Sequence, residues 1–306
     1  MSSEPNTDIR PALAAGLSSY LIWGVAPLFF QALDFANPFE IVMHRIIWAV
    51  PILALVLAVS GKMRQAIAVL SDRRTILTLV GTAALISVNW WIFIFAVNSG
   101  HVLQASLGYY INPLMSVAVG VIVLREPLGP FRIAAIVLAA LGVANQIIAV
   151  GQVPWVSLAL ATSFTAYGYL RKVAAVDGRI GLFWETSFNL PIALIGLTVL
   201  QLNGLGHFQE SPAQALMLMA AGLVTVVPLL LYAIGVRGLH LSTMGLLQFI
   251  APSMQFAIGV MGGETFTASH LVTFAFIWAG VGMFAYSTLR RRKKPVIAAE
   301  AQPEAE

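Results

Sequence analysis

Arg45 and His44 stand side by side within an apolar run over residues 38–51. Placing an arginine at the centre of a membrane-spanning helix costs about 2.5–3.5 kcal/mol by insertion scales, so such a residue usually faces a protein interior or a water-filled path. We predict that Arg45 lines a binding cavity; the alternative is that it snorkels to the membrane surface. His44 titrates near neutral pH and is a candidate substrate contact or proton relay, with a packing role as the alternative.

Glu185 is a second ionisable residue within an apolar stretch, and it stands one helical turn before Asn189. Residues four apart lie on one face of a helix, so the two side chains are expected to point the same way. A carboxylate that takes a proton on one side of a membrane and releases it on the other would couple transport to protons. The alternative is a carboxylate held near the membrane surface. Both residues are candidates for substrate binding.

Tyr109 and Asn112 lie three residues apart, beside Pro113. A second segment places Gln248 one turn before Pro252 in the same way. Proline leaves a carbonyl group without its helical donor, and paired breaks in corresponding helices are typical of transporter binding sites. We therefore predict that these polar side chains contact substrate. The alternative is hydrogen bonding between helices, which contributes only about 0.6 kcal/mol on average in membranes.

Three aromatic residues well inside apolar segments complete the predicted binding set: Trp90, Trp91 and Tyr110. Aromatic faces stack on flat substrates and attract cations. The alternative is an anchoring role, because tryptophan and tyrosine are enriched where a helix crosses the membrane surface.

Long apolar segments must position these residues. Of the 306 residues, 59% are hydrophobic and only 10% are charged, whereas soluble domains are about one quarter charged. An unpaired backbone is not tolerated in lipid, so segments of about 20 apolar residues are predicted to be helices. The sequence predicts an all-α integral membrane protein with ten transmembrane helices, at about 12–31, 39–59, 76–96, 102–123, 133–150, 155–170, 180–200, 215–235, 240–261 and 268–289.

The basic residues predict the orientation of these helices. If the connections are assigned alternately to the two sides, every lysine and arginine except Arg45 falls on one side, together with both ends of the chain. Arg171, Lys172 and Arg179 are assigned to one connection on that side. Positively charged connections face the cytoplasm, so both termini are predicted to be cytoplasmic.

The two halves of the chain resemble each other at an offset of about 137–144 residues. Arg45 precedes Pro51 by the same interval as Glu185 precedes Pro191. Five helices per half would make the second half run through the membrane in the opposite sense, as in transporters whose substrate site lies between inverted repeats. The predicted organisation is a cytoplasmic tail at 1–11, repeats at 12–150 and 151–289, and a basic, then disordered, cytoplasmic tail at 290–306.

Four stretches of the sequence resemble the RarD group of EamA-type transporters, in the drug/metabolite transporter superfamily: 43–48 (MHRIIW), 89–98 (NWWIFIFAVN), 105–113 (ASLGYYINP) and 167–172 (YGYLRK). The resemblance covers about residues 10–290. It implies a bacterial inner-membrane permease, and the outward direction of transport rests on this resemblance alone. Arg45 and Glu185 together would suit a small metabolite that is an amino-acid-like zwitterion, or an amphipathic drug. The resemblance also implies a central cavity lined by the first four helices of each repeat, with the fifth and tenth helices peripheral and often at a homodimer contact.

Other classes of membrane protein fit the sequence less well. There is no GxxxxGK[ST] phosphate loop, which excludes a P-loop ATPase within this chain. The five histidines are scattered without metal-ligand spacing, and no nucleophile–base pair indicates an enzyme or a cofactor. We predict a secondary active transporter in a lipid bilayer, with a small-molecule substrate, protons as the coupling ion and no nucleic-acid partner. A facilitator without ion coupling and, less favoured, a membrane enzyme are the alternatives.

Overall fold

The computed structural model describes residues 9–98, 102–151, 155–261 and 268–291, and these residues are helical with no strand. The helices are α1 (Arg10–Gln31), α2 (Pro38–Val59), α3 (Met63–Ala68), η1 (Val69–Ser71), α4 (Arg73–Asn98), α5 (Val102–Ile122), α6 (Pro130–Val150), α7 (Trp155–Val173), α8 (Gly178–Leu202), α9 (Pro212–Gly238), α10 (Leu241–Gln248), α11 (Ile250–Met261) and α12 (Ala268–Arg291). Six of them are long and apolar enough to cross a membrane: α1, α2, α4, α6, α8 and α9.

The helices follow the predicted segments to within a few residues, with three differences. The short helices α3 and η1 occupy a predicted connection, and the ninth segment is divided at Phe249 into α10 and α11. Helix α7 extends to Val173, so Arg171 and Lys172 lie in its last turn. The assignment of Arg171 to a connection was therefore wrong. Most of the predicted tails, residues 1–8 and 292–306, lie outside the described residues.

Helix starts are fixed by side chains that bind the free backbone N–H groups of the first turn. The Asn37 side chain accepts a hydrogen bond from the Glu40 N–H at 2.8 Å, and Pro38 takes the first helical position of α2. The Ser211 hydroxyl accepts a bond from the Gln214 N–H at the start of α9 in the same way. These caps set where the apolar segments begin.

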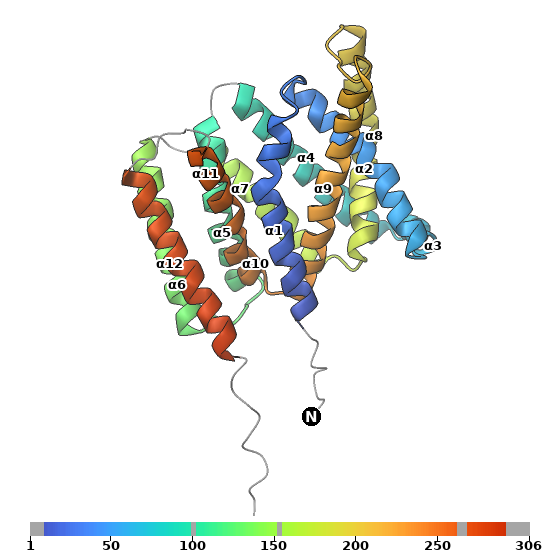
Figure 1. Ribbon diagram of the computed structural model, residues 1–306. Helices are drawn as coiled ribbons and strands as arrows, with labels where there is room; N and C mark the ends of the chain where they lie inside the picture. The colour runs from blue at the N-terminus through green and yellow to red at the C-terminus, as the bar shows by residue number, and fades with distance from the viewer. Residues whose placement is uncertain (1–8, 99–101, 152–154, 262–267, 292–306) are drawn as a thin grey trace, which may run out of the picture.

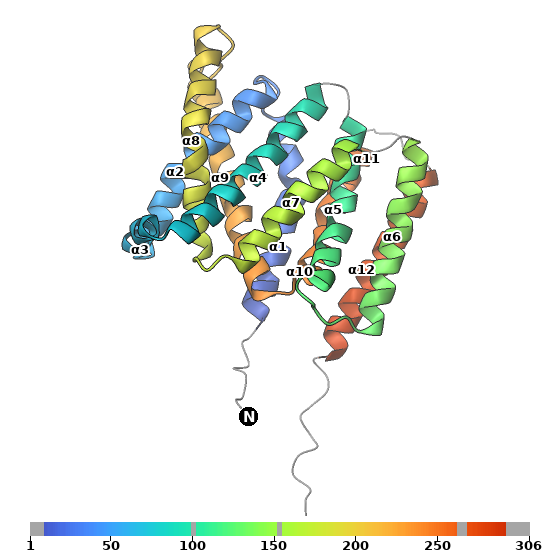
Figure 2. The same ribbon diagram turned by 180° about the vertical axis from the view of Figure 1, so that it is seen from behind.

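Helices α6 and α12 form a pair at one edge of the bundle, and α2, α3 and α8 lie at the opposite edge (Figures 1 and 2). Between these edges, α1 and α9 pack together on one face, and α4 and α7 pack together on the other (Figures 1 and 2). Close contact between α6 and α12 depends on glycine. A Cβ atom on Gly142 would lie 2.8 Å from the Thr273 carbonyl oxygen, and one on Gly280 would lie 2.7 Å from that of Ala135.

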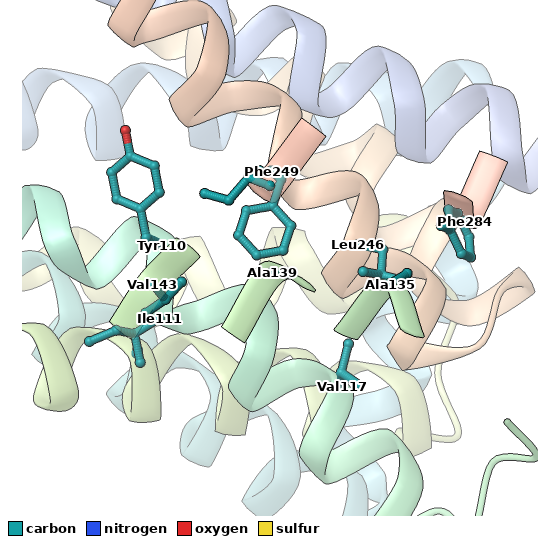
Figure 3. Close-up of a cluster of buried hydrophobic side chains, with 11 residues drawn as sticks. Tyr110, Ile111, Val117, Ala135, Ala139, Val143, Leu246, Phe249 and Phe284 are labelled. Atoms are coloured by element: carbon teal, nitrogen blue, oxygen red, sulfur yellow. The ribbon is translucent and has the colours of Figure 1, made fainter. Parts of the chain in front are cut away.

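A hydrophobic cluster ties the α6–α12 pair to the rest of the bundle. Tyr110 of α5 and Phe249, between α10 and α11, join side chains of α6 and α12 in this cluster (Figure 3). The Tyr110 ring also packs edge-on against Phe274, with ring centroids 5.9 Å apart. Tyr110 is therefore part of the packing between α5 and the edge pair.

Both described ends of the chain, the start of α1 and the end of α12, lie at the same end of the bundle (Figure 1). The turns from α5 to α6, from α7 to α8 and from α9 to α10 lie at this end too, with α3 (Figures 1 and 2). These connections and the flanking helix ends carry the basic residues Lys62, Arg64, Arg73, Arg74, Arg125, Arg132, Arg171, Lys172, Arg179 and Arg237. We call this the basic end of the molecule.

Candidate functional site

A cavity of about 610 Å³ lies between helices of both halves of the chain. Its volume is within the range of about 300–1,000 Å³ that holds drug-sized ligands. Its walls come from the second half of α1, the first half of α2 and the second half of α4, so it lies in the half of the bundle away from the basic end. The residues that line it are Tyr20, Trp23, Ala26, Pro27, Phe30, Gln31, Pro38, Ile41, Val42, Arg45, Ile86, Asn89, Trp90, Phe93, Gly108, Tyr109, Asn112, Leu160, Phe164, Leu229, Gln248, Ala251, Pro252 and Gln255.

Arg45 is held in the cavity wall by one hydrogen bond and two aromatic rings. Its Nε–H donates to the Thr225 hydroxyl at 2.8 Å, and that hydroxyl donates to the Ala221 carbonyl. Its guanidinium carbon lies 5.3 Å from the centre of the Phe30 ring and 5.5 Å from that of Trp90. These cation–π contacts hold the guanidinium plane in place. Among the described residues, no carboxylate lies within ion-pair distance of Arg45.

Some polar groups in the cavity have a hydrogen-bond partner within the protein, and others have none among the described residues. The Gln255 amide donates to the Trp23 carbonyl at 3.0 Å, and the Asn112 carbonyl oxygen accepts from Thr165 at 2.8 Å. The amides of Gln31 and Gln248 and the Tyr109 hydroxyl line the cavity without a hydrogen-bond partner among the described residues. These unbound groups can recognise the polar atoms of a ligand.

Of the ten predicted site residues, five are brought together in this cavity: Arg45, Trp90, Tyr109, Asn112 and Gln248. The other five, Trp91, Tyr110, His44, Glu185 and Asn189, do not line it. Trp91 is 48% exposed and packs on Phe39, with ring centroids 5.4 Å apart. Tyr110 is in the cluster beside α6 and α12 (Figure 3).

His44 faces away from the cavity and lies beside a buried carboxylate. Its Nδ1 accepts a hydrogen bond from the Trp48 indole at 3.2 Å, and its ring stacks on Phe208 at 4.9 Å. Its Nε2 is 3.9 Å from the Glu40 carboxylate. Glu40 also accepts hydrogen bonds from the backbone and ring of His207, each at 2.7 Å. The group therefore joins the start of α2 to the connection between α8 and α9.

Glu185 and Asn189 lie behind the cavity, at a small pocket that Arg45 and Trp90 also line. The carboxylate of Glu185 is 3.1 Å from Nη1 of Arg171 and accepts a hydrogen bond from the Tyr167 hydroxyl at 3.2 Å. Glu185 is 2% exposed and Arg171 is 1% exposed. The Asn189 amide donates to the Glu185 carbonyl. Glu185 is therefore one half of a buried ion pair.

A layer of aromatic rings separates the cavity from this ion pair. Tyr20, Trp23 and Phe164 line the cavity, and Tyr167 and Tyr232 pack against them. The Tyr167 and Tyr232 rings are stacked, with centroids 6.3 Å apart. Because the Tyr167 hydroxyl also donates to Glu185, the aromatic layer and the ion pair are in direct contact.

Three residues in or behind the cavity were not included by sequence reasoning. Phe30 and Thr225 contact Arg45 directly, and Arg171 neutralises Glu185. The repeat contained a signal for Thr225, because it lies 143 residues after Thr82, so that both halves carry a threonine at this position of an apolar segment. Phe30 carried no such signal, since it is one of many apolar residues in α1.

Comparison with known proteins identifies the family of the chain. A model of the EamA-like transporter family matches residues 10–145. An uncharacterized transporter of Vibrio cholerae is 41% identical over 285 residues, which cover 92% of this chain and 94% of that protein. Protein RarD of Salmonella typhi is 38% identical over 287 residues, which cover 93% of this chain and 98% of that protein.

A solved crystal structure has the same fold, with a TM-score of 0.69 at 17% identity, over 92% of this chain and 99% of that chain. The likeness at this identity concerns the fold alone. The sequence relatives reach nearly the full length of both chains at well over 30% identity. The chain therefore belongs to the RarD group of EamA-like transporters, in the drug/metabolite transporter superfamily.

Proposed function

We propose that this transporter is a secondary carrier that moves a small organic solute across the bacterial inner membrane by alternating access, with the Arg45 cavity as its substrate site. The observation that carries the proposal is the cavity itself. It is large enough for a solute, it lies between the two halves, and it contains an arginine without a counter-ion among the described residues. An intramembrane charge of this kind marks a substrate or ion pathway.

The packing of the helices supports an inverted repeat. In such a repeat, α1, α2, α4, α5 and α6 correspond to α7, α8, α9, α10–α11 and α12. Each contact then has a counterpart: α1 packs on α9 as α7 packs on α4, and α2 packs on α9 as α8 packs on α4. In the same way, α5 packs on α7 as α10–α11 packs on α1, and the remaining principal contacts, α2 with α8, α5 with α10 and α6 with α12, join corresponding helices. In transporters built from inverted repeats, one repeat moves against the other, so that the substrate site opens alternately to the two sides of the membrane.

The positions of charge support ten spans with the basic end in the cytoplasm. Basic connections remain on the cytoplasmic side, and the described ends of the chain lie at the basic end. In that orientation the cavity is in the outer half of the membrane, and the aromatic layer with the Glu185–Arg171 pair closes the cytoplasmic side. Transport then requires this closure to open.

Transport along this route can be driven by a proton gradient or by the gradient of the solute itself. One observation favours the second, a facilitator, over proton coupling at Glu185. The Glu185 carboxylate is already neutralised by Arg171 and does not line the large cavity. A proton-coupled carrier would lose its dependence on an imposed pH gradient in the Glu185→Gln variant. A facilitator would transport equally with and without the gradient.

The absence of cysteine from the chain permits a direct test of the route. In Gln248→Cys, a membrane-impermeant thiol reagent added from outside is expected to react and to block uptake into proteoliposomes of fixed orientation, and transported solute should slow the reaction. Gln65→Cys, in an exposed position on α3, is the matched control and should react only from the inside. Labelling of the Gln248→Cys variant without any effect on the uptake of any transported solute would contradict the proposal.

A further inference from the structure

The large cavity carries a net positive charge. Arg45 is the single charged side chain among the described residues that line it. The Nε–H group of the guanidinium is bound to Thr225, and no other hydrogen bond is recorded for it within the described part of the chain. The two terminal nitrogens of Arg45 therefore remain available. A planar guanidinium presents its N–H groups in a fork that matches the two oxygens of a carboxylate or sulfonate.

The described residues that line the cavity offer no equivalent site for a cationic group. The candidate for such a site was Glu185, but its carboxylate binds Arg171 and Tyr167 outside the cavity. The faces of Phe30 and Trp90, which could attract a cation, are occupied by the guanidinium of Arg45. An ammonium group near Arg45 would be repelled by it without compensation.

The remaining walls fit an apolar body. Trp23, Phe93 and Phe164 present ring surface to the cavity, and about half of its other lining residues are aliphatic. Burial of apolar surface is favourable in proportion to the area removed from water. The Gln248 amide and the Tyr109 hydroxyl provide a small number of additional polar contacts.

From this arrangement we infer that the substrate is an organic monoanion: one carboxylate or sulfonate group that binds Arg45, attached to an aromatic or bulky apolar body. This inference rests on the proposed function, because it assumes that the Arg45 cavity is the transport site. It also supplies an energy source. A membrane potential of 100 mV, negative inside, drives one negative charge outward. This driving force equals that of a concentration ratio of about fifty-fold. Export of such a solute needs no coupling ion.

The test uses the full chain in liposomes and four radiolabelled probes of similar size. They are 2-phenylethanesulfonate, its neutral sulfonamide, the cation phenylethyltrimethylammonium, and phenylalanine as a zwitterion. The sulfonate is permanently charged, so it does not leak through the bilayer as a neutral acid would. A potassium gradient with valinomycin sets the membrane potential. Uptake of the sulfonate is expected to saturate, to be at least ten-fold faster than that of the other probes, and to accelerate when the inside is positive.

Substitutions at Arg45 separate charge from shape. Arg45→Gln is expected to lose at least ten-fold in sulfonate uptake and in equilibrium binding in detergent. Arg45→Lys should retain uptake with weaker binding, because it keeps the charge and loses the fork. Arg64→Gln, exposed on α3, is the matched control and should be unchanged. A monodisperse elution profile for each variant shows that it is folded.

Several results would overturn the inference. They are uptake of the sulfonamide, the cation or phenylalanine at the rate of the sulfonate, sulfonate uptake that is indifferent to the potential, or unchanged sulfonate binding in Arg45→Gln. Failure of the sulfonate together with uptake of another probe would refute the anionic class and leave the proposed carrier function standing. Failure of all four probes would refute this class, while the cysteine-labelling test would still decide the proposed function with other solutes.

Discussion

Arg45 and Glu185 occupy corresponding positions in the two halves of the chain, yet their surroundings differ. Each lies six residues before a proline; Arg45 donates a hydrogen bond to Thr225, and Thr82 is the residue that corresponds to Thr225 in the other half. Glu185 has a buried arginine as its counter-ion, whereas Arg45 has none among the described residues.

The repeat identifies the position at which a counter-ion for Arg45 would be expected. At the offset of 144 residues that aligns Gly24 with Gly168, Arg171 corresponds to Pro27, an uncharged residue of the cavity wall. The two halves therefore carry charges of opposite sign at corresponding positions, and a counter-ion accompanies only one of them. In the proposed function, the complete pair belongs to the cytoplasmic closure and the unpaired Arg45 belongs to the substrate site. The comparison teaches that an intramembrane charge should be judged by its partner as well as by its depth.

The largest expected effect on stability comes from breaking the complete pair. Arg171→Met leaves the Glu185 carboxylate buried without a counter-ion, and removal of one partner of a buried pair costs about 3–5 kcal/mol. Thermal unfolding in detergent should show a large decrease in Tm. The double variant Arg171→Met/Glu185→Leu should recover most of it, since replacing both partners by apolar residues is often neutral. A double variant as unstable as the single one would show that the pair is not the cause.

A smaller but specific effect is expected from completing the incomplete pair. Pro27→Glu places a carboxylate in the cavity wall at the position that corresponds to Arg171. Neutralisation of Arg45 by this carboxylate should reduce anion uptake at least ten-fold while the protein remains folded. Pro27→Gln, similar in size and uncharged, is the control. Equal uptake by the two variants would show that Arg45 and position 27 do not interact.

The two threonines provide a finer comparison. Thr225→Val removes the hydroxyl that accepts from Arg45, and Thr82→Val removes the corresponding hydroxyl of the other half, which donates to the Leu79 carbonyl. A single hydrogen bond in a membrane contributes about 0.6–1.7 kcal/mol, so each change should be modest. Thr225→Val is expected to weaken anion binding several-fold, and Thr82→Val to lower only Tm. The opposite assignment of effects would contradict the division of roles between the two charges.

The smallest effect concerns an ion pair outside the membrane, between Asp177 and Lys62, whose atoms are 2.6 Å apart. Partial burial raises the pKa of Asp177, but the hydrogen bonds from Lys62 and from the Arg179 N–H outweigh it, so the pKa is lowered overall. The pair therefore stabilises the fold above the ordinary carboxyl pKa of about 4, and this stabilisation is lost as the pH falls and Asp177 becomes protonated. Asp177→Asn should lower stability at neutral pH by no more than about 1 kcal/mol, with no difference at low pH. Thermal scans at the two pH values test this.

Much of the fold could be predicted from the sequence because apolar length and basic connections are one-dimensional signals. The predicted segments match the observed helices closely, and the break at Phe249 lies in the segment whose polar and proline residues had already been noted. Residues on the cavity were found where polar side chains interrupt apolar segments, as at Arg45 and Gln248.

The remainder could not be predicted because it depends on which helices touch. His44 and Trp91 stand in the same segments as Arg45 and Trp90 but point to other neighbours, and neighbouring positions on a helix face about 100° apart. Arg171 was assigned to a connection because an arginine near a helix end normally lies at the membrane surface. Its burial becomes evident only when α7 and α8 are placed together, with Glu185 beside it.

The most direct test of the central claim compares two variants in one assay: Arg45→Ala and the double variant Arg171→Met/Glu185→Leu, each measured for anion uptake into proteoliposomes beside the parent protein. If the incomplete charge binds substrate and the complete pair only closes the cytoplasmic side, Arg45→Ala should abolish uptake while the folded double variant retains it. Uptake that survives in Arg45→Ala and disappears in the folded double variant would contradict the account and transfer the substrate site to Glu185.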